Sequence, residues 1–493
     1  MTRRNLSVGQ KIIAVIIGAL LTGFIWHVRG QHGYGAKWGM FCVGAVIVMY
    51  IYSLYANRRS MNYEMVPMAA AFAAVTAGGW GTLNSQIGGV LSAGAFYPDE
   101  AVIRYVEISP VSGIVIMVLL GFGWMPLFSI VLGSLFSHKK YAFKDYVIFV
   151  GVYYVTMLIC SLTISHMALK LINPQAVECC ADGIKAMGHD YSPMEAYIVK
   201  FGNAAWAKKI PYCRNYFTSI NVISSAIGAL VSSIVVGSVL KDKFNAIFSS
   251  VSNLFCGIGI CVASVVLGAS AESRTVFTGI NVPFSIGSNA WEIWEYFTGF
   301  IYGLLLMIFI VCLPHKYTDS EADYKYVPKF ENKKFSIFYN KIFTFLFMFG
   351  VILSRAVGSR ILGRVTDDEV IEIIITVVLS VISFFVVKKI VDKNMIEKNL
   401  DTPENMGVKE FYTKALAIYI GIISVTYFFL GERSSKNILC IDYGRLFSSG
   451  GIRELWAEGA LTDPALMLST LAVMGVLYYV LCLKGLGRER KAS

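Results

Sequence analysis

Titratable side chains lie at the ends of two apolar segments of this chain. His27 and His32 follow the apolar run at residues 11–28, and Glu292 and Glu295 stand at the start of another such run. Histidine exchanges protons near neutral pH, and paired carboxylates can act as general acid and base. The two glutamates are three residues apart, so they share one face of a helix. These four are our candidate catalytic residues.

Each candidate also has a structural interpretation, which the sequence leaves open. A histidine at a membrane boundary can be a hydrogen-bonded anchor. A carboxylate in a first helical turn complements the helix dipole, and Asn289 stands where it could cap that helix.

Arginine gathers on the side of the chain that we expect to face outward, whereas the loops expected inside prefer lysine. The segment "SRAVGSRILGR" carries Arg355, Arg360 and Arg364, and Arg29 adjoins a glycine-rich stretch. A planar guanidinium binds phosphate or carboxylate through two parallel hydrogen bonds. The alternative is that these arginines pair with nearby acids or form the rim of the membrane surface. The candidate substrate-binding residues are Arg29, Trp80, Asn84, Gln86, Glu272, Arg274, Asn289, Trp291, Arg355, Arg360 and Arg364.

Tryptophan shares this asymmetry. The chain has 8 tryptophans. Trp124 lies near the middle of an apolar run, and the others stand at or beyond the boundary expected to be outer. An interfacial aromatic belt explains them in part, although such belts form at both interfaces. The alternative is that some rings stack on a sugar or a cation.

The composition defines the class of protein that must position these side chains. The 493 residues are 56% hydrophobic and only 15% charged, which indicates an integral membrane protein. The net charge of +11 mostly marks cytoplasmic loops and does not indicate nucleic acid. We interpret the first apolar run as a retained span, because no small-residue cleavage site follows it.

The sequence predicts an all-α fold of about 12 transmembrane helices in a single transmembrane domain, residues 1–493. Every even-numbered joint between spans is basic, as are both ends of the chain, so both termini are expected in the cytoplasm. The expected spans are 11–28, 37–55, 66–96, 109–136, 146–172, 217–240, 245–270, 291–313, 338–354, 366–387, 411–431 and 463–484.

The third span is expected to be broken or re-entrant. Its segment "GGWGTLNSQIGG" places glycines and then Asn84, Ser85 and Gln86 within an apolar run. Non-helical backbone at membrane depth is tolerated where it is buried in protein or lines a polar cavity. We therefore expect Asn84 and Gln86 to face such a cavity.

A long extracytoplasmic loop is expected at residues 173–216, between spans 5 and 6. Ser192, Pro193 and Glu195 form a capping-box start, and apolar residues then recur at helical spacing. This pattern predicts an amphipathic helix on the outer surface. Cys213 is expected to pair with Cys179 or Cys180, because disulfides are permitted outside the cytoplasm.

No Ser-His-Asp order, HExxH motif or P-loop is present, and the cysteine spacing does not indicate a zinc site. We therefore expect no metal and no cofactor. Membrane lipids are the expected partners, with no nucleic acid, and the oligomeric state is open.

Three functional hypotheses remain. The first, which the one-sided chemistry favours, is a membrane-embedded transferase whose outward-facing cavity handles an anionic, lipid-linked or glycan-type substrate. The second is a secondary transporter of a polar or anionic solute, although the sequence shows little polar chemistry at mid-span. The third is a non-catalytic receptor or assembly factor. Whether the chain is an enzyme stays open. The expected location is the plasma membrane, with an extracytoplasmic functional face.

Overall fold

The computed structural model describes residues 8–31, 43–44, 47, 50–51, 110–139, 141–201, 211–270, 290–314, 317, 378–379, 382, 385–386 and 389. In these ranges the regular structure is entirely helical, as the sequence predicts. The chain divides into two compact units, residues 76–306 and the combination of 1–75 with 307–493. The expected single domain stays a prediction, because a division of contacts does not show independent folding.

Five of the described helices are long and apolar enough to cross a membrane, and the bent pair of α5 (Pro110–Trp124) and α6 (Pro126–Phe136) would make a sixth span. The five stretches are Val8–His27, Lys144–Ser161, Ser219–Ser238, Lys243–Ser264 and Trp294–Val311. They coincide with the first and the fifth to eighth expected spans, and the bent pair with the fourth. The broken third span lies outside the described residues.

In the first unit, helix α1 (Val8–Gln31) contains the first of the candidate spans. Thr22 donates a hydrogen bond to the Gly18 carbonyl at 2.7 Å, and Tyr50 donates to the Ala14 carbonyl at 2.6 Å. The helix continues through Gly30, so Arg29 stands on helical backbone rather than in the glycine-rich turn that its surroundings suggest.

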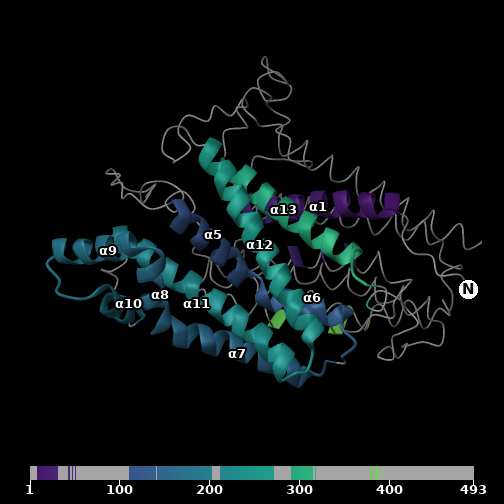
Figure 1. The fold of residues 1–493 in the computed structure, drawn as a ribbon, viewed down its shortest axis with the longest axis horizontal. Helices are drawn as coiled ribbons and strands as arrows, with labels where there is room; N and C mark the ends of the chain where they lie inside the picture. The colour runs from purple at the N-terminus through teal and green to yellow at the C-terminus, as the bar shows by residue number, and fades with distance from the viewer. Residues whose placement is uncertain are drawn as a thin grey trace, which may run out of the picture. The chain divides into compact units, whose positions relative to one another are not determined.

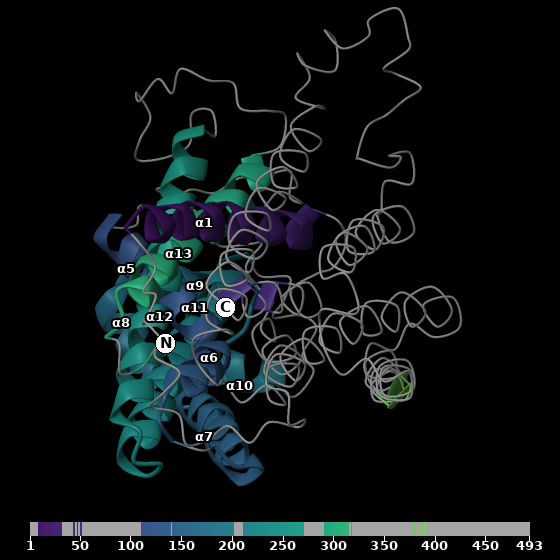
Figure 2. The same cartoon turned by 90° about the vertical axis from the view of Figure 1, so that its right-hand side faces the viewer.

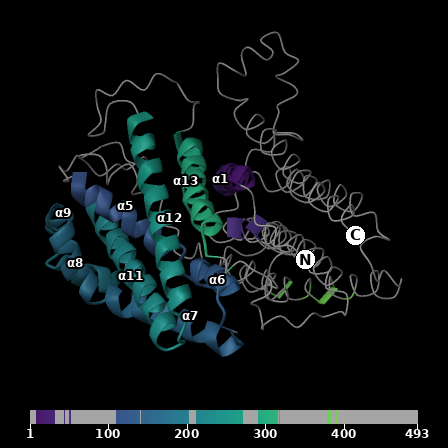
Figure 3. The ribbon, with the colours of Figure 1, turned by 45° about the vertical axis from the view of Figure 1, so that its right-hand side comes forward.

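The second unit contains most of the described helices. Its candidate membrane-crossing helices are α5 (Pro110–Trp124), α6 (Pro126–Phe136), α7 (Phe143–Ser161), α11 (Pro211–Ser238) and α12 (Lys243–Ser270). Helix α11 packs against α7, α5 and α12 (Figure 1). Helix α13 (Ala290–Val311) runs beside α12 (Figure 3), and the boundary between the two units falls inside it.

Short helices occupy one end of this unit. They are α8 (Ile164–Ile172), α9 (Pro174–Ala186) and α10 (Pro193–Phe201), and they lie at the end of α7 opposite the α11–α12 turn (Figure 1). The expected fifth span, 146–172, is therefore too long. Its apolar helix ends at Ser161, and Leu162–Thr163 separate it from α8.

The helices of the unit alternate in direction, which places alternate joints at the same end. Ser137 and Tyr141, between α6 and α7, bond to Asp242, between α11 and α12. At the other end Ser112 near the start of α5 donates to the Ile172 carbonyl. The joint between the fourth and fifth expected spans therefore lies at the same end as the joint between the sixth and seventh, as the basic-loop pattern predicts. Figure 2 shows α6 and α7 from the side.

Candidate functional site

The most distinctive feature of the second unit is a break in its first membrane-crossing element. Helices α5 and α6 meet at Met125 with a bend of 55°. The local sequence "GFGWMP" accounts for the break, because Pro126 has no N–H to give to the Phe122 carbonyl. The sequence predicts a broken helix in the third span, and the structure places one in the fourth.

Two contacts hold the end of α5 at this break. Tyr153 of α7 donates its hydroxyl at 3.0 Å to the Gly123 carbonyl, which belongs to the last turn of α5 and has no donor within that helix. Gly123 also permits close approach to α11, since an added Cβ would lie 2.4 Å from Ser225 Oγ and 2.7 Å from the Ala226 nitrogen. The break is therefore packed inside the bundle.

Helix α12 lies alongside both halves of the broken element. Near its middle, Cys256 and Gly257 touch Gly121 of α5, where an added Cβ would be 2.5 Å from the Gly257 Cα. One turn earlier, Ser252 accepts a hydrogen bond from Ser129 of α6 at 2.9 Å. Residues 253–255 of α12 thus lie at the level of the break.

Buried hydroxyl groups link α12 to its neighbours across the membrane-crossing part. Ser252 also shares a 3.2 Å hydrogen bond with Tyr302 of α13, and Ser249 shares one of 3.1 Å with Ser233 of α11. Closer to the other end of α12, Trp294 donates its indole N–H to Ser264 at 3.1 Å. These hydrogen-bonded hydroxyl groups are polar groups near the middle of the apolar helices, where the sequence predicts few.

Two buried side chains at this depth have no hydrogen-bond partner within the described part of the chain. They are Asn253 of α12, at both amide atoms, and Thr298 of α13, at its hydroxyl. Both are 0% exposed. In hydrocarbon such groups are costly unless another polar group satisfies them, and they commonly mark functional positions.

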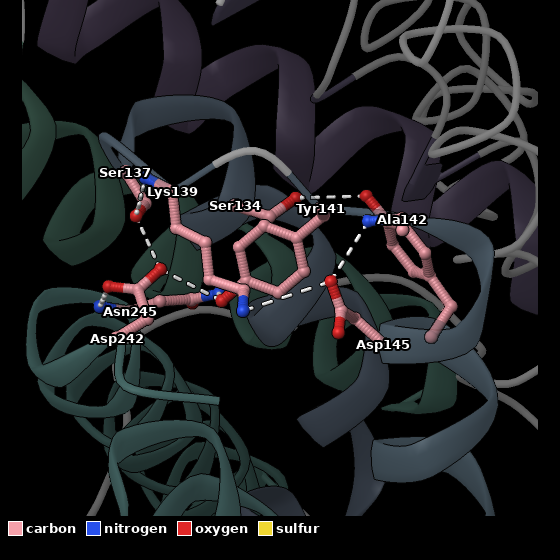
Figure 4. Close-up of polar contacts among 9 residues, drawn as sticks. Ser134, Ser137, Lys139, Tyr141, Ala142, Asp145, Asp242 and Asn245 are labelled. Atoms are coloured by element: carbon pink, nitrogen blue, oxygen red, sulfur yellow. Dashed lines mark hydrogen bonds and ion pairs between the residues drawn. The ribbon is translucent and has the colours of Figure 1, made fainter. Parts of the chain in front are cut away.

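A second polar cluster joins the α6–α7 and α11–α12 turns. Figure 4 shows Ser137 and Tyr141 pointing toward Asp242, to which both donate hydrogen bonds, the tyrosine at 2.8 Å. Asp242 is 5% exposed, and its other oxygen caps α12 by accepting the Asn245 backbone N–H at 3.0 Å. One carboxylate thereby fixes the start of α12 and both turns.

Asn245 and Asp145 extend this cluster. The Asn245 amide donates to the Ile130 carbonyl at 3.0 Å and to the Tyr141 hydroxyl at 2.7 Å. Asp145 accepts from the Ala142 N–H at 2.9 Å and lies 3.8 Å from the Lys139 ammonium. Burial, followed by the charge of Asp242, raises the pKa of Tyr141, so this phenol stays protonated and donates. The cluster is a structural clamp.

The opposite end of the unit holds a buried aromatic cluster. His166 Nε2 donates to the Ser161 carbonyl at 2.9 Å, and its Nδ1 accepts from the Tyr216 hydroxyl at 2.6 Å, which fits the neutral ring. Tyr197 of α10 packs edge-on against His166 and donates to Asn221 at 2.7 Å. This cluster attaches α10 to α8 and α11.

The start of α10 confirms the expected cap. The Ser192 N–H donates to Glu195 at 2.7 Å, and the Glu195 N–H donates to the Ser192 hydroxyl at 3.2 Å. Ala196 and Tyr197 of α10 are buried, whereas Met194 and Ile198, which belong to the apolar residues at helical spacing, are exposed. The apolar stripe thus points away from the bundle, which suits a helix lying at a membrane interface.

The cysteines of this region leave the expected disulfide untested. Burial, followed by the charges of Asp182 and Glu178, raises the pKa of Cys179, a free thiol in the structure. The Cys213 side chain lies outside the described residues, so its pairing with Cys179 or Cys180 stays a prediction.

Whether the candidate residues from the sequence share one site stays a prediction, because most of them lie outside the described part of the chain and the others belong to different units. His27 is buried near the end of α1, in the first unit, and Glu295 is 9% exposed on α13, in the second. Trp291 and Glu292 lie on the helical backbone of α13, and Arg29 on that of α1, but their side chains lie outside the description. Also outside it are His32, Trp80, Asn84, Gln86, Glu272, Arg274, Asn289, Arg355, Arg360 and Arg364.

The tryptophans whose side chains are described are Trp26, Trp124 and Trp294, and all three are buried, whereas the candidate binding residues Trp80 and Trp291 are not among them. Trp26 and Trp294 are 0% and 1% exposed, so both rings are buried. Among the described residues, no group of three or more histidine, cysteine, aspartate or glutamate side chains could hold a metal ion.

Sequence reasoning missed Asn253, Asp242 and the break at Met125. The break had a local signal, two glycines and a proline within an apolar run. Asp242 also had a local signal, because aspartate is a common residue directly before a helix, where its side chain accepts the N–H of the third helical residue, here Asn245. Asn253 is one of two asparagines in the largely apolar helix α12, and the sequence pattern alone does not show that it is buried beside α5.

Comparison with known proteins gives no assignment: no family model, no curated protein and no solved structure matches the chain.

Proposed function

We propose that this protein is a secondary transporter of a small polar or anionic solute. The supporting observation is the broken α5–α6 element, whose two halves lie against a helix with buried hydroxyl and amide groups. Broken helices buried among polar side chains are the usual way in which transporters build a solute site inside the bilayer.

The membrane-embedded transferase favoured by the sequence is the competing hypothesis. Its support is the set of arginines and tryptophans expected on the outer side, most of which lie outside the described residues. The buried hydroxyl and amide groups along α12 are polar groups at mid-span, where a transporter needs them, and they favour the transporter over the transferase.

Reconstitution of the full chain into proteoliposomes tests the proposal. Uptake of radiolabelled lactate, glycine, glucose and inorganic phosphate would be measured with imposed sodium or proton gradients. We expect gradient-dependent uptake of at least one solute. Absence of uptake, together with sugar transfer from a lipid-linked donor, would favour the transferase instead.

A matched pair of serine variants connects transport to the bundle interior. Ser252→Ala removes a hydroxyl that bonds to α6 and α13, whereas the hydroxyl of Ser250 bonds, among the described residues, only to the Ala246 carbonyl of its own helix, at 2.8 Å. We expect Ser252→Ala to slow uptake by about tenfold and Ser250→Ala to leave it nearly unchanged, since tenfold corresponds to about 1.4 kcal/mol.

A further inference from the structure

Asn253 lies on the face of α12 that packs against the broken element. It precedes Cys256 and Gly257 by three and four residues, so the three share one helix face. Because Cys256 and Gly257 contact Gly121 of α5, Asn253 lies one turn from that contact, in the direction of α6. Ser249, one turn further on, contacts Ser233 of α11. The Asn253 amide therefore faces the junction of α5, α6 and α11.

This amide carries unused donors and acceptors. It is fully buried, and neither its Nδ2 nor its Oδ1 has a hydrogen-bond partner among the described residues. An amide of this kind is well placed to bind a polar group that enters the bundle.

The start of α6 supplies further donors at the same level. Met125 at the N-cap makes no side-chain hydrogen bond, and Pro126 occupies the first turn. The N–H groups of Leu127 and Phe128 belong to that turn and have no acceptor within α6, although both residues are fully buried. The helix dipole adds positive potential at this end.

The opposing end of α5 offers less negative potential, because Tyr153 donates to the Gly123 carbonyl. Neither α5 nor α6 contains a charged residue, and the only charged residue of α12 is Lys243 at its start. Among these three helices, a group held here would meet donors but no counter-ion, which suits one negative charge rather than two.

From this geometry we propose that the α5–α6 break is a binding site for a carboxylate or another singly charged oxyanion group. The Asn253 Nδ2 and the first-turn N–H groups of α6 donate to its oxygens. The proposal rests on the proposed function, since it assigns the anionic group of the transported solute to this site.

Acetate and its neutral isostere acetamide test the site directly. The melting temperature of the purified full-length protein in detergent would be measured against each, with sodium chloride keeping the ionic strength constant. We expect acetate to raise it saturably by several degrees and acetamide to leave it unchanged. Stabilisation by both, or by neither, would overturn the assignment of an anion site.

Three variants locate the effect. Asn253→Leu should abolish the acetate effect, and Asn253→Asp, which keeps the volume of the side chain, should abolish it by repulsion. Ser250→Ala should retain it. If Asn253→Leu does not fold, Asn253→Asp alone decides, and an unchanged acetate response in either folded Asn253 variant contradicts the site.

The uptake assay separates this proposal from the proposed function. Acetate stabilisation that depends on Asn253, without uptake of any solute by the unmodified protein, would support the site and refute transport. Uptake of an anionic solute with the same KM in Asn253→Leu would support transport and refute the site.

Discussion

At the scale of single residues, Asp242 organises more of the described structure than any residue that the sequence singled out. It accepts hydrogen bonds from Ser137, Tyr141 and the Asn245 backbone while nearly excluded from solvent. Asp242→Ala leaves three donors without this acceptor. We expect a loss of stability of about 1–3 kcal/mol for each buried donor that water does not reach, measured as a lower melting temperature.

Asp190→Asn is the control for this variant, because Asp190 is exposed in the turn before α10. It should melt within about one degree of the unmodified protein, since exposed substitutions usually change stability by less than ~0.5 kcal/mol. Equal melting temperatures for Asp242→Ala and Asp190→Asn would show that the clamp is not stabilising.

Tyr153 is the residue on which the broken helix depends most directly. Tyr153→Phe removes the hydroxyl that donates to the Gly123 carbonyl and leaves that buried oxygen without its donor. We expect destabilisation by about 1–3 kcal/mol, read from the melting temperature. The neighbouring Tyr154→Phe serves as the control and should change it less, because Tyr154 is only partly buried.

At the scale of elements, the α5–α6 break requires close approach to α11. Gly123→Ala would place a Cβ 2.7 Å from the Ala226 backbone nitrogen, which cannot rotate away as a side chain can. We expect a loss of about 1–3 kcal/mol from overpacking, and slower uptake. Gly151→Ala in α7, where an added Cβ meets nothing within 4 Å, should be neutral or slightly stabilising.

Helix α10 should respond to pH through its cap. The hydrogen bonds from the Ser192 N–H and hydroxyl hold the pKa of Glu195 below its usual value. The folded-state pKa is thus the lower one, so the cap stabilises α10 at neutral pH and is lost as the pH falls through the lowered pKa. Hydrogen exchange of α10 amides, corrected for intrinsic rates, should show less protection below about pH 4.

Glu195→Gln should remove most of this pH dependence while leaving the rest of the bundle unchanged. An identical pH profile in both proteins would mean that another group controls the stability of α10.

Features set by local sequence were predicted well, and features set by long-range contacts were not. The described spans follow from apolar length, and the α10 cap follows from Ser192 and Glu195, which are close in sequence. Met194 and Ile198 have the right spacing, but the contacts of Tyr197 with His166 and Asn221 decide which face packs. The hydrogen bond from Tyr141 to Asp242 joins residues about a hundred positions apart in the sequence, and the spacing of apolar residues does not reveal such a contact.

At the scale of the whole molecule, the charge pattern and the helix directions make one joint prediction about topology. The clamp places the α6–α7 and α11–α12 turns at one end, and these turns carry the basic loops expected in the cytoplasm. The α8–α10 segment lies at the other end, which the same pattern expects outside.

Cysteine labelling in intact cells tests this topology. In a cysteine-depleted background, Lys144→Cys and Lys243→Cys report on the clamp end, and Lys185→Cys and Asp190→Cys on the α8–α10 end; all four positions are exposed. A membrane-impermeant maleimide should label the second pair at once and the first pair only after permeabilisation. Labelling of Lys144→Cys and Lys243→Cys from opposite sides would contradict the alternation of the helices. Reversal of all four would keep that alternation and refute the cytoplasmic placement of the basic loops, because positive charge would then stand on the translocated side.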